Sequence, residues 1–341
     1  MGAVSAIIDA DFFGDMRMAQ IEVLARLADG EFHSGQVLAD SMGISRTAIW
    51  KQLARLEGLG LQLESIRGRG YRIPGGLDLL RAEDIRDRLS VEAASLAAEL
   101  RVMPVVDSTN AELLRASALT AGRGLACTAE QQQSGRGRRG RRWVSPFARN
   151  VYLSVAWEFA QGATALEGLS LAAGVCVARA LVAAGIAEPQ LKWPNDVLYH
   201  GRKVGGILIE MTGDAAGPAR AVLGVGINVS MPLVTAKGID QPWTDLASVA
   251  GSDVPRRSTL VAELLNNLLP MLATFEDSGF AAWREKWGIL DAHAGKPVTV
   301  TMGAERLAGT DMGANERGAL LLETTAGVVP IYGGEVSLRA G

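Results

Sequence analysis

Cysteine, histidine and long apolar runs are all scarce in this sequence. The 341 residues include two cysteines, Cys127 and Cys176, which excludes a framework of disulfides and indicates a reducing compartment. The three histidines, His33, His200 and His293, are scattered and do not indicate a metal site. The first thirteen residues lack a basic segment followed by an apolar one, so we expect no signal peptide.

The longest apolar stretch, residues 169–186, is interrupted by Arg179 and predicts a buried helix, not a membrane span. Hydrophobic residues make up 48% and charged residues 21% of the chain, which is ordinary for a globular protein and excludes a disordered one. The net charge is −3, so any surface for nucleic acid must be a local patch. We therefore expect a cytoplasmic protein without a membrane partner, with two to three domains of ~150 residues.

Residues 16–74 follow the pattern of a winged helix-turn-helix, with three helices and a hairpin that turns at residues 67–70. Ser34 and Ser45 stand where the second and third helices need N-caps. Residues 46–72 contain six basic and two acidic side chains, so this part of an acidic protein carries a local positive charge. A helical interaction module with a solvated charged face is the alternative. The candidates for DNA contact are Arg46, Thr47, Trp50, Lys51, Arg67 and Arg69.

The rest of the chain predicts an α+β protein in two further parts. Residues 82–290 begin with a short helix at 82–89 and then favour a mixed sheet, with strands over 101–106, 125–130, 151–157, 204–211 and 221–229. Helices are expected over 166–184, 258–275 and 281–290, the second broken or kinked near Pro270. Residues 294–341 predict a small SH3-like β-barrel from short strands over 297–302, 307–311, 319–323, 328–332 and 335–338.

A basic, glycine-rich loop spans residues 135–143 and contains five arginines. Gly135, Gly137 and Gly140 match G-x-G-x-x-G, yet no apolar strand leads into Gly135 and no apolar helix follows, which argues against a dinucleotide-binding turn. Ordering such a loop is costly, so we expect it to be mobile without an anionic ligand that pairs with several arginines. A solvated basic loop and a non-specific RNA-binding tract remain as alternatives.

Three further segments combine polar side chains with glycine or proline. Residues 107–110 are Asp-Ser-Thr-Asn, residues 192–196 are Lys-Trp-Pro-Asn-Asp, and residues 202–208 are Arg-Lys-Val-Gly-Gly-Ile-Leu. Taken singly, each is explained as a helix cap or a turn. Taken in order with the basic loop, they resemble the motifs of the biotin protein ligases. With the winged helix in front, residues 16–339 resemble the bifunctional members of that family, which also repress a biotin operon.

The resemblance implies an enzyme whose central domain has the biotin/lipoate ligase fold. Biotin and MgATP would give biotinyl-5'-AMP, and the activated carboxyl would then pass to a lysine of the biotin carboxyl carrier protein of acetyl-CoA carboxylase. The implied partners also include operator DNA and, when the adenylate is bound, a second copy of the chain. A non-catalytic biotin-sensing repressor and a lipoate-type adenylating ligase are the alternatives.

The same resemblance implies roles for individual residues. Biotin would contact Ser108, Thr109, Asn110, Gln132, Arg136, Gly137, Arg138 and Lys203. ATP or the adenylate would contact Arg136, Arg138, Arg141, Trp143, Asn228, Trp243 and Arg339. The catalytic groups would be Lys203, Arg138, Lys192 and Asp196, with Asp196 also a candidate for binding Mg²⁺ or the incoming lysine amine.

Overall fold

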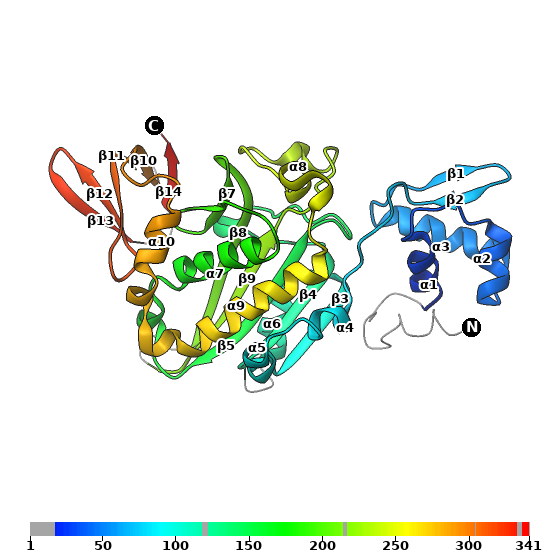
Figure 1. Ribbon diagram of the computed structural model, residues 1–341, viewed down its shortest axis with the longest axis horizontal. Helices are drawn as coiled ribbons and strands as arrows, with labels where there is room; N and C mark the ends of the chain where they lie inside the picture. Colours follow the sequence, from blue (N-terminus) through cyan, green and yellow to red (C-terminus); the bar gives the residue numbers. More distant parts are fainter. Residues whose placement is uncertain (1–17, 118–121, 214–216, 304, 333–335, 341) are drawn as a thin grey trace.

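The structure is a computed structural model, and it describes residues 18–340 except 118–121, 214–216, 304 and 333–335. Figure 1 shows a helical unit at the N-terminal end, a large central sheet with helices, and a small sheet at the C-terminal end. Among the described residues, every helix is too short or too polar to span a bilayer.

The N-terminal unit has the predicted three helices and hairpin. These are α1 (Met18–Leu27), α2 (Gly35–Met42), α3 (Arg46–Gly58), β1 (Glu64–Ile66) and β2 (Gly70–Arg72). The two predicted N-caps are confirmed, because the hydroxyls of Ser34 and Ser45 each accept a backbone hydrogen bond of 3.1 Å, from Val37 and Ala48. The winged helix-turn-helix pattern is therefore confirmed.

The central sheet has seven strands in the order β3-β4-β5-β9-β8-β7-β6. Their bounds are β3 Glu99–Val106, β4 Leu125–Gln132, β5 Val151–Phe159, β6 Gln190–Lys192, β7 Asp196–Tyr199, β8 Arg202–Gly213 and β9 Ala219–Ile227. Strands β3 and β4 are parallel, and the other described pairs are antiparallel. The sheet is mixed, as predicted, although the short hairpin β6–β7 was not expected.

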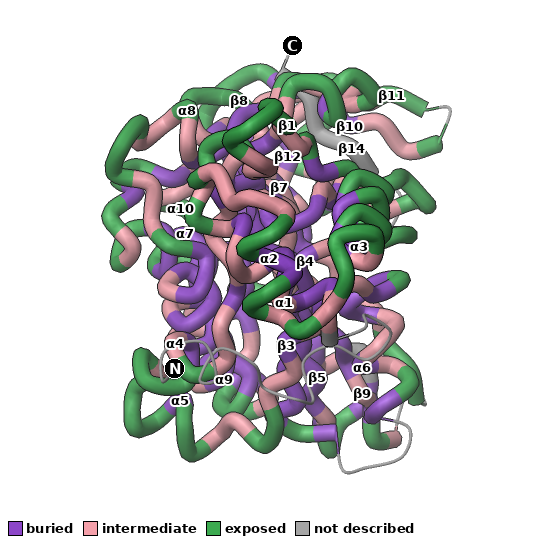
Figure 2. The backbone as a smooth tube through the Cα atoms, turned by 90° about the vertical axis from the view of Figure 1, so that its right-hand side faces the viewer, coloured by how far each residue is buried: buried purple, intermediate pink, exposed green. Residues whose placement is uncertain are grey.

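Helices cover the sheet and form the core with it. They are α4 (Ala82–Arg86), α5 (Val91–Leu96), α6 (Thr109–Ser117), α7 (Leu169–Ala183), α8 (Leu246–Ala250), α9 (Arg257–Ser278) and α10 (Arg284–Leu290). In Figure 2 the buried backbone gathers on the central strands and on α7.

Of the break or kink predicted near Pro270, the break is wrong, because α9 continues through this residue to Ser278. Proline in a helix interior costs ~3 kcal/mol. Burial of the flanking apolar side chains Leu268, Leu269, Met271 and Leu272 offsets that cost. Tertiary packing therefore decides the length of this helix.

The C-terminal strands form one antiparallel sheet in the order β13-β12-β11-β10-β14. Their bounds are β10 Pro297–Met302, β11 Glu305–Ala314, β12 Leu320–Thr324, β13 Gly327–Ile331 and β14 Val336–Ala340. The five predicted strands are confirmed. The outer strands β13 and β14 do not pair with each other among the described residues, so the sheet is not closed as a barrel. The Trp193 indole N–H donates to the Gly318 carbonyl at 3.0 Å and joins this sheet to the central domain.

Two sets of contacts fasten the N-terminal unit to the central domain. Phe147 and Ala148 belong to the same buried apolar cluster as the winged-helix residues Leu27 and Leu56. The connecting segment is held from the other side, because the backbone N–H of Leu80 donates to a Glu130 carboxylate oxygen at 2.7 Å. The N-terminal unit and the sheet are therefore packed together.

Candidate functional site

A cavity of about 660 Å³ lies where the ends of the central strands meet the basic loop. Except for Arg339, every residue that the resemblance implied for biotin, ATP or catalysis lines it: Ser108, Thr109, Asn110, Gln132, Arg136, Gly137, Arg138, Arg141, Trp143, Lys192, Asp196, Lys203, Asn228 and Trp243. Arg339 is on β14, opposite Thr299 of β10, and its side chain lies outside what the structure describes. Six separate segments of the sequence thus converge on one cavity.

The neutral end of the cavity is a network of hydrogen-bonded side chains, which we call the floor network. The Thr109 hydroxyl donates to the Gln132 side-chain oxygen at 3.2 Å, and the Gln132 amide donates to the Ser145 hydroxyl at 3.2 Å. The Ser154 hydroxyl lies 2.7 Å from the Thr109 hydroxyl and 2.6 Å from the Asn110 side-chain oxygen. These buried groups can both donate and accept, which suits a compact neutral ligand.

Ser145 and Ser154 were missed by the sequence analysis. Ser154 is fully buried between apolar residues of β5, where a buried hydroxyl requires a hydrogen-bonding partner. That pattern was the available signal for Ser154. Ser145 follows the basic loop in a segment without any regular pattern, so the sequence carried no comparable signal.

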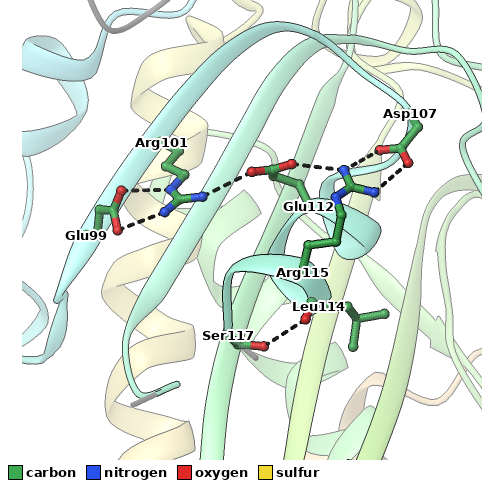
Figure 3. A network of polar contacts seen from close by, with 7 residues as sticks. All are labelled: Glu99, Arg101, Asp107, Glu112, Leu114, Arg115 and Ser117. Atoms are coloured by element: carbon green, nitrogen blue, oxygen red, sulfur yellow. Dashed lines mark hydrogen bonds and ion pairs between the residues drawn. The ribbon is translucent and has the colours of Figure 1, made fainter. Parts of the chain in front are cut away.

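Ion pairs at the surface fix the start of α6, which supplies Thr109 and Asn110 (Figure 3). The Arg115 guanidinium donates to both Asp107 carboxylate oxygens, at 2.8 and 3.0 Å, and lowers the pKa of that carboxyl. Glu112 accepts from Arg115 and from Arg101 of β3, at 2.9 and 3.0 Å. The first turn of α6 is thereby held against the edge strand of the sheet.

The basic loop folds as a small hairpin. The Gly137 N–H donates to the Arg141 carbonyl, and the Trp143 N–H donates to the Gly135 carbonyl, each at 2.8 Å. Arg139 at the tip has a φ of 59°, which is costly for a residue with a side chain. The loop backbone is held by its own hydrogen bonds, and its mobility in the absence of an anionic ligand stays a prediction.

Two arginines of this loop point to opposite ends of the cavity. The Arg138 guanidinium donates to the Asn195 side-chain oxygen at 3.3 Å, beside the lysine-rich end. Burial and the neighbouring Arg139 lower the pKa of Arg138, although an arginine remains charged at neutral pH. Arg136 instead lies 3.4 Å from a carboxylate oxygen of Glu210. The loop therefore spans the cavity.

Trp143 closes one side of the cavity. A Cβ on Gly226 would lie 2.6 Å from its indole ring, and one on Gly206 would lie 3.5 Å from it. The Lys203 amine is 5.6 Å from the ring centroid, within the range of a cation–π interaction. The glycines of β8 and β9 thus make room for the indole, as close approach to the backbone requires.

The cationic end of the cavity is built around Asp196. Its carboxylate oxygens lie 2.6 Å from the Lys203 amine and 3.8 Å from the Lys192 amine. Backbone hydrogen bonds fix Lys203 against the following segment, since its N–H donates to Pro242 at 3.0 Å and its carbonyl accepts from Thr244 at 2.9 Å. Trp243 is therefore held beside Lys203, and both line the cavity. The arrangement concentrates positive charge where an anion can bind.

The six candidates for DNA contact are on the N-terminal unit and are all exposed. The Trp50 side chain on α3 is 63% exposed, which is unusual for tryptophan unless the surface contacts another molecule. At the hairpin tip, the Arg69 guanidinium stacks on the Phe32 ring, 4.2 Å from its centroid. One face of α3 and the hairpin tip therefore present basic and aromatic groups together.

Family models match three parts of the chain. Residues 19–72 match a helix-turn-helix (HTH) domain, residues 102–228 match the biotin/lipoate A/B protein ligase family, and residues 293–339 match the biotin protein ligase C-terminal domain. The second match covers most of the elements around the cavity, and the third covers the small C-terminal sheet.

Curated relatives and solved structures agree with these matches. The chain is 41% identical over 321 residues to the bifunctional ligase/repressor BirA of Escherichia coli, covering 94% of this chain and 97% of that protein. It is 30% identical to the protein of the same name from Bacillus subtilis, covering 95% and 98% of the two chains. The biotin protein ligase from Aquifex aeolicus in complex with biotin and ATP superposes with a TM-score of 0.61 at 29% identity, covering 72% of this chain and all of that one.

Proposed function

Because the chain belongs to the biotin protein ligase family, among the bifunctional ligase/repressors, we propose that it joins biotin to AMP and then to a protein lysine. ATP and biotin are the substrates, biotinyl-5'-AMP is the intermediate, and the acceptor is a biotin carboxyl carrier protein. The observation that carries this proposal is the single cavity in which a neutral polar floor lies next to a lysine- and arginine-rich end. The ureido ring of biotin fits the neutral polar floor. The biotin carboxylate and the α-phosphate of ATP, which must meet, fit the lysine- and arginine-rich end.

The chemistry of the first step matches the groups in the cavity. A carboxylate attacks a phosphorus atom, so no general base is needed, and the site must hold two anions together and stabilise the developing charge. We assign Lys203, Lys192 and Arg138 to that task. The hydrogen-bonding groups Ser108, Thr109, Asn110 and Gln132, with Arg136 and Gly137, would hold biotin.

The nucleotide would extend from the cationic end. Arg141, Trp143, Asn228 and Trp243 line the cavity on that side, and Arg339 is proposed to contribute from β14. The described residues contain no cluster of three or more metal-ligating groups, so Mg²⁺ would be held mainly by the phosphates. Asp196 lines the cavity beside the Lys203 amine and would supply a carboxylate ligand to such an ion. When bound, Mg²⁺ would neutralise phosphate charge.

We further propose that residues 16–74 bind operator DNA as a repressor. The exposed residues of α3 and of the hairpin tip would contact phosphates and bases. Dimerisation on binding the adenylate would hold two such units at a fixed spacing, and sedimentation with and without biotinyl-5'-AMP tests it.

The two free, buried cysteines are consistent with the cytoplasm as the compartment. Residues 82–290 would form the ligase domain and residues 294–341 the C-terminal domain.

The decisive experiment is mass spectrometry of a carrier domain incubated with the protein, biotin and MgATP. We expect the mass to rise by one biotin on one lysine. Biotin-dependent exchange of pyrophosphate into ATP separates an enzyme from a non-catalytic sensor, which would show none. Competition of labelled biotin by lipoate identifies the acid: strong competition would favour a lipoate-type ligase instead.

A further inference from the structure

Glu210 is a carboxylate behind the cavity that is not among its lining residues. It lies on β8, and its side chain is 27% exposed. One carboxylate oxygen accepts a hydrogen bond of 2.8 Å from the Asn110 side-chain amide. The other lies 3.4 Å from the Arg136 guanidinium of the basic loop. A single side chain thus touches both the floor network and the loop.

These two contacts complete a chain of polar groups around the neutral end of the cavity. From Glu210 the chain runs through Asn110 and Ser154 to Thr109, and from there through Gln132 and Ser145. It ends at the carbonyl of Trp143, which accepts from the Ser145 hydroxyl at 3.0 Å. Both ends of the basic loop are therefore tied to the floor network, one through Arg136 and the other through Trp143.

The hydrogen bonds also fix how Asn110 is oriented. Its amide nitrogen donates to Glu210, so its side-chain oxygen is the atom that faces Ser154. A carboxylate only accepts hydrogen bonds, and it therefore selects this orientation of the amide over the flipped one. The Leu208 carbonyl also accepts from the amide nitrogen, at 3.4 Å, so without Glu210 the Asn110 amide would keep only that longer contact to hold its orientation.

We propose that Glu210 is a positioning residue that holds the basic loop closed over the neutral end of the cavity and orients Asn110 for the ligand. The proposal rests on the proposed function for the identity of that ligand, biotin. The charge of Glu210 neutralises Arg136, so this arginine is kept from the cationic end of the cavity while Arg138 remains beside Asn195. Glu210 touches no reacting group and acts through Asn110 and Arg136.

The first test is hydrogen exchange of the full-length protein without ligand. In Glu210→Gln the amide oxygen still accepts from Asn110 but the ion pair to Arg136 is lost, so the N–H groups of Gly137 and Trp143 should exchange severalfold faster. Glu158→Gln is the matched control, because Glu158 pairs with Arg220 at 2.8 Å on the same sheet and does not line the cavity. Exchange in Glu210→Gln that equals the wild-type rate would overturn the role in holding the loop.

A double variant separates this role from general destabilisation. If the effect passes through Arg136, then Glu210→Gln combined with Arg136→Gln should exchange as Arg136→Gln does alone. Additive effects of the two substitutions on the exchange rates would contradict a direct action of Glu210 on Arg136. Melting temperatures of all variants identify any variant that is merely less well folded.

The second test measures biotin binding and the split between KM and kcat. We expect about threefold weaker biotin binding in Glu210→Gln, from loss of a partly exposed ion pair. Glu210→Ala should lose about tenfold, because the Asn110 hydrogen bond goes as well. Both should raise the KM for biotin and leave kcat nearly unchanged. Equal binding by the two variants would remove the Asn110 part of the proposal. If the wild-type protein bound no biotin, the proposed function would fail. The exchange experiment would still show whether Glu210 holds the basic loop through Arg136.

Discussion

The indole ring of Trp143 rests on the backbone of Gly226, so closely that a Cβ on Gly226 would lie 2.6 Å from the ring. This contact seats the end of the basic loop on β9, in the middle of the central sheet. The ring in turn lies beside the Lys203 amine, 5.6 Å from its centroid. The position of one glycine therefore determines where the loop closes and what the Lys203 amine faces.

We expect Gly226→Ala to push the indole out of the cavity wall and to weaken biotin binding by about tenfold or more, since overpacking of this kind costs ~1–3 kcal/mol. Tryptophan fluorescence and the KM for biotin measure the two effects. Gly288→Ala on α10 is the control, because a Cβ there meets nothing within 4 Å. A Gly226→Ala protein with unchanged fluorescence and KM would contradict the role given to this contact.

Lys203→Ala should lower adenylation by ~10²-fold or more, as expected for loss of a group that stabilises charge in the transition state. Lys192 would remain near Asp196, at 3.8 Å, and cannot replace the amine that lies at 2.6 Å. Biotin-dependent exchange of pyrophosphate into ATP measures the effect, with the exposed Lys237→Ala as control. Operator binding by a protein loaded with adenylate should change far less. A near-normal exchange rate would remove Lys203 from the mechanism.

The residues that the resemblance implied line one cavity, except for Arg339, and most of them occur in compact motifs; their roles stay predictions. The sequence did not predict their geometry. Asp196 lies beside Lys203 because β7 and β8 form a hairpin that turns at His200 and Gly201, a local signal that the sequence analysis did not use. Glu210 was missed for a different reason, since its partner Asn110 lies 100 residues away in the sequence. Such long-range contacts become visible only when the strand order is known.

The DNA-binding prediction is best tested by single substitutions on the exposed faces. Lys51→Ala and Arg67→Ala should each weaken binding to all DNA sequences by a similar factor. Each should also reduce the slope of log K against log salt concentration by about one, because one phosphate contact is lost. Biotin ligation should be unaffected, and the exposed Arg306→Ala on β11 is the control. Deletion of residues 1–74 should also abolish DNA binding, but it uncovers Phe147, which is 2% exposed in the intact chain. Unchanged affinity in both point variants would refute the assigned DNA surface.

Asp291 makes the stability of the protein depend on pH. Burial, with the nearby Asp311, raises the pKa of Asp291 to about 7. Because the folded state binds this proton more tightly than the unfolded state, the stabilisation is complete below the unfolded pKa and is lost as the pH rises towards 7. Asp291→Asn should therefore gain melting temperature relative to wild type when the pH is raised from about 5 to about 8. A constant difference between the two proteins would contradict this, and the exposed Asp277→Asn serves as control.

The buried pair of Glu130 and Arg257 connects the linker after the winged helix to the central domain. Both residues are 1% exposed, and the Arg257 guanidinium also donates to the carbonyls of Asp78 and Asn150. Glu130 in addition accepts the backbone N–H of Leu80 at 2.7 Å. Removing one partner leaves the other charge buried without compensation, so the pair should be intolerant of single substitutions.

We expect Arg257→Met to destabilise the protein by about 3–5 kcal/mol in urea unfolding, while Glu130→Leu combined with Arg257→Met should recover much of that loss. The double variant is the informative one for function. It removes the side-chain hydrogen bonds to the Asp78 carbonyl and from the Leu80 N–H, while the backbone N–H of residue 257 still donates to the Asp78 carboxylate. The cavity groups stay in place, so ligation should persist while operator binding weakens. Operator affinity equal to wild type in a stable double variant would mean that packing against Phe147 alone is sufficient to orient the DNA-binding unit.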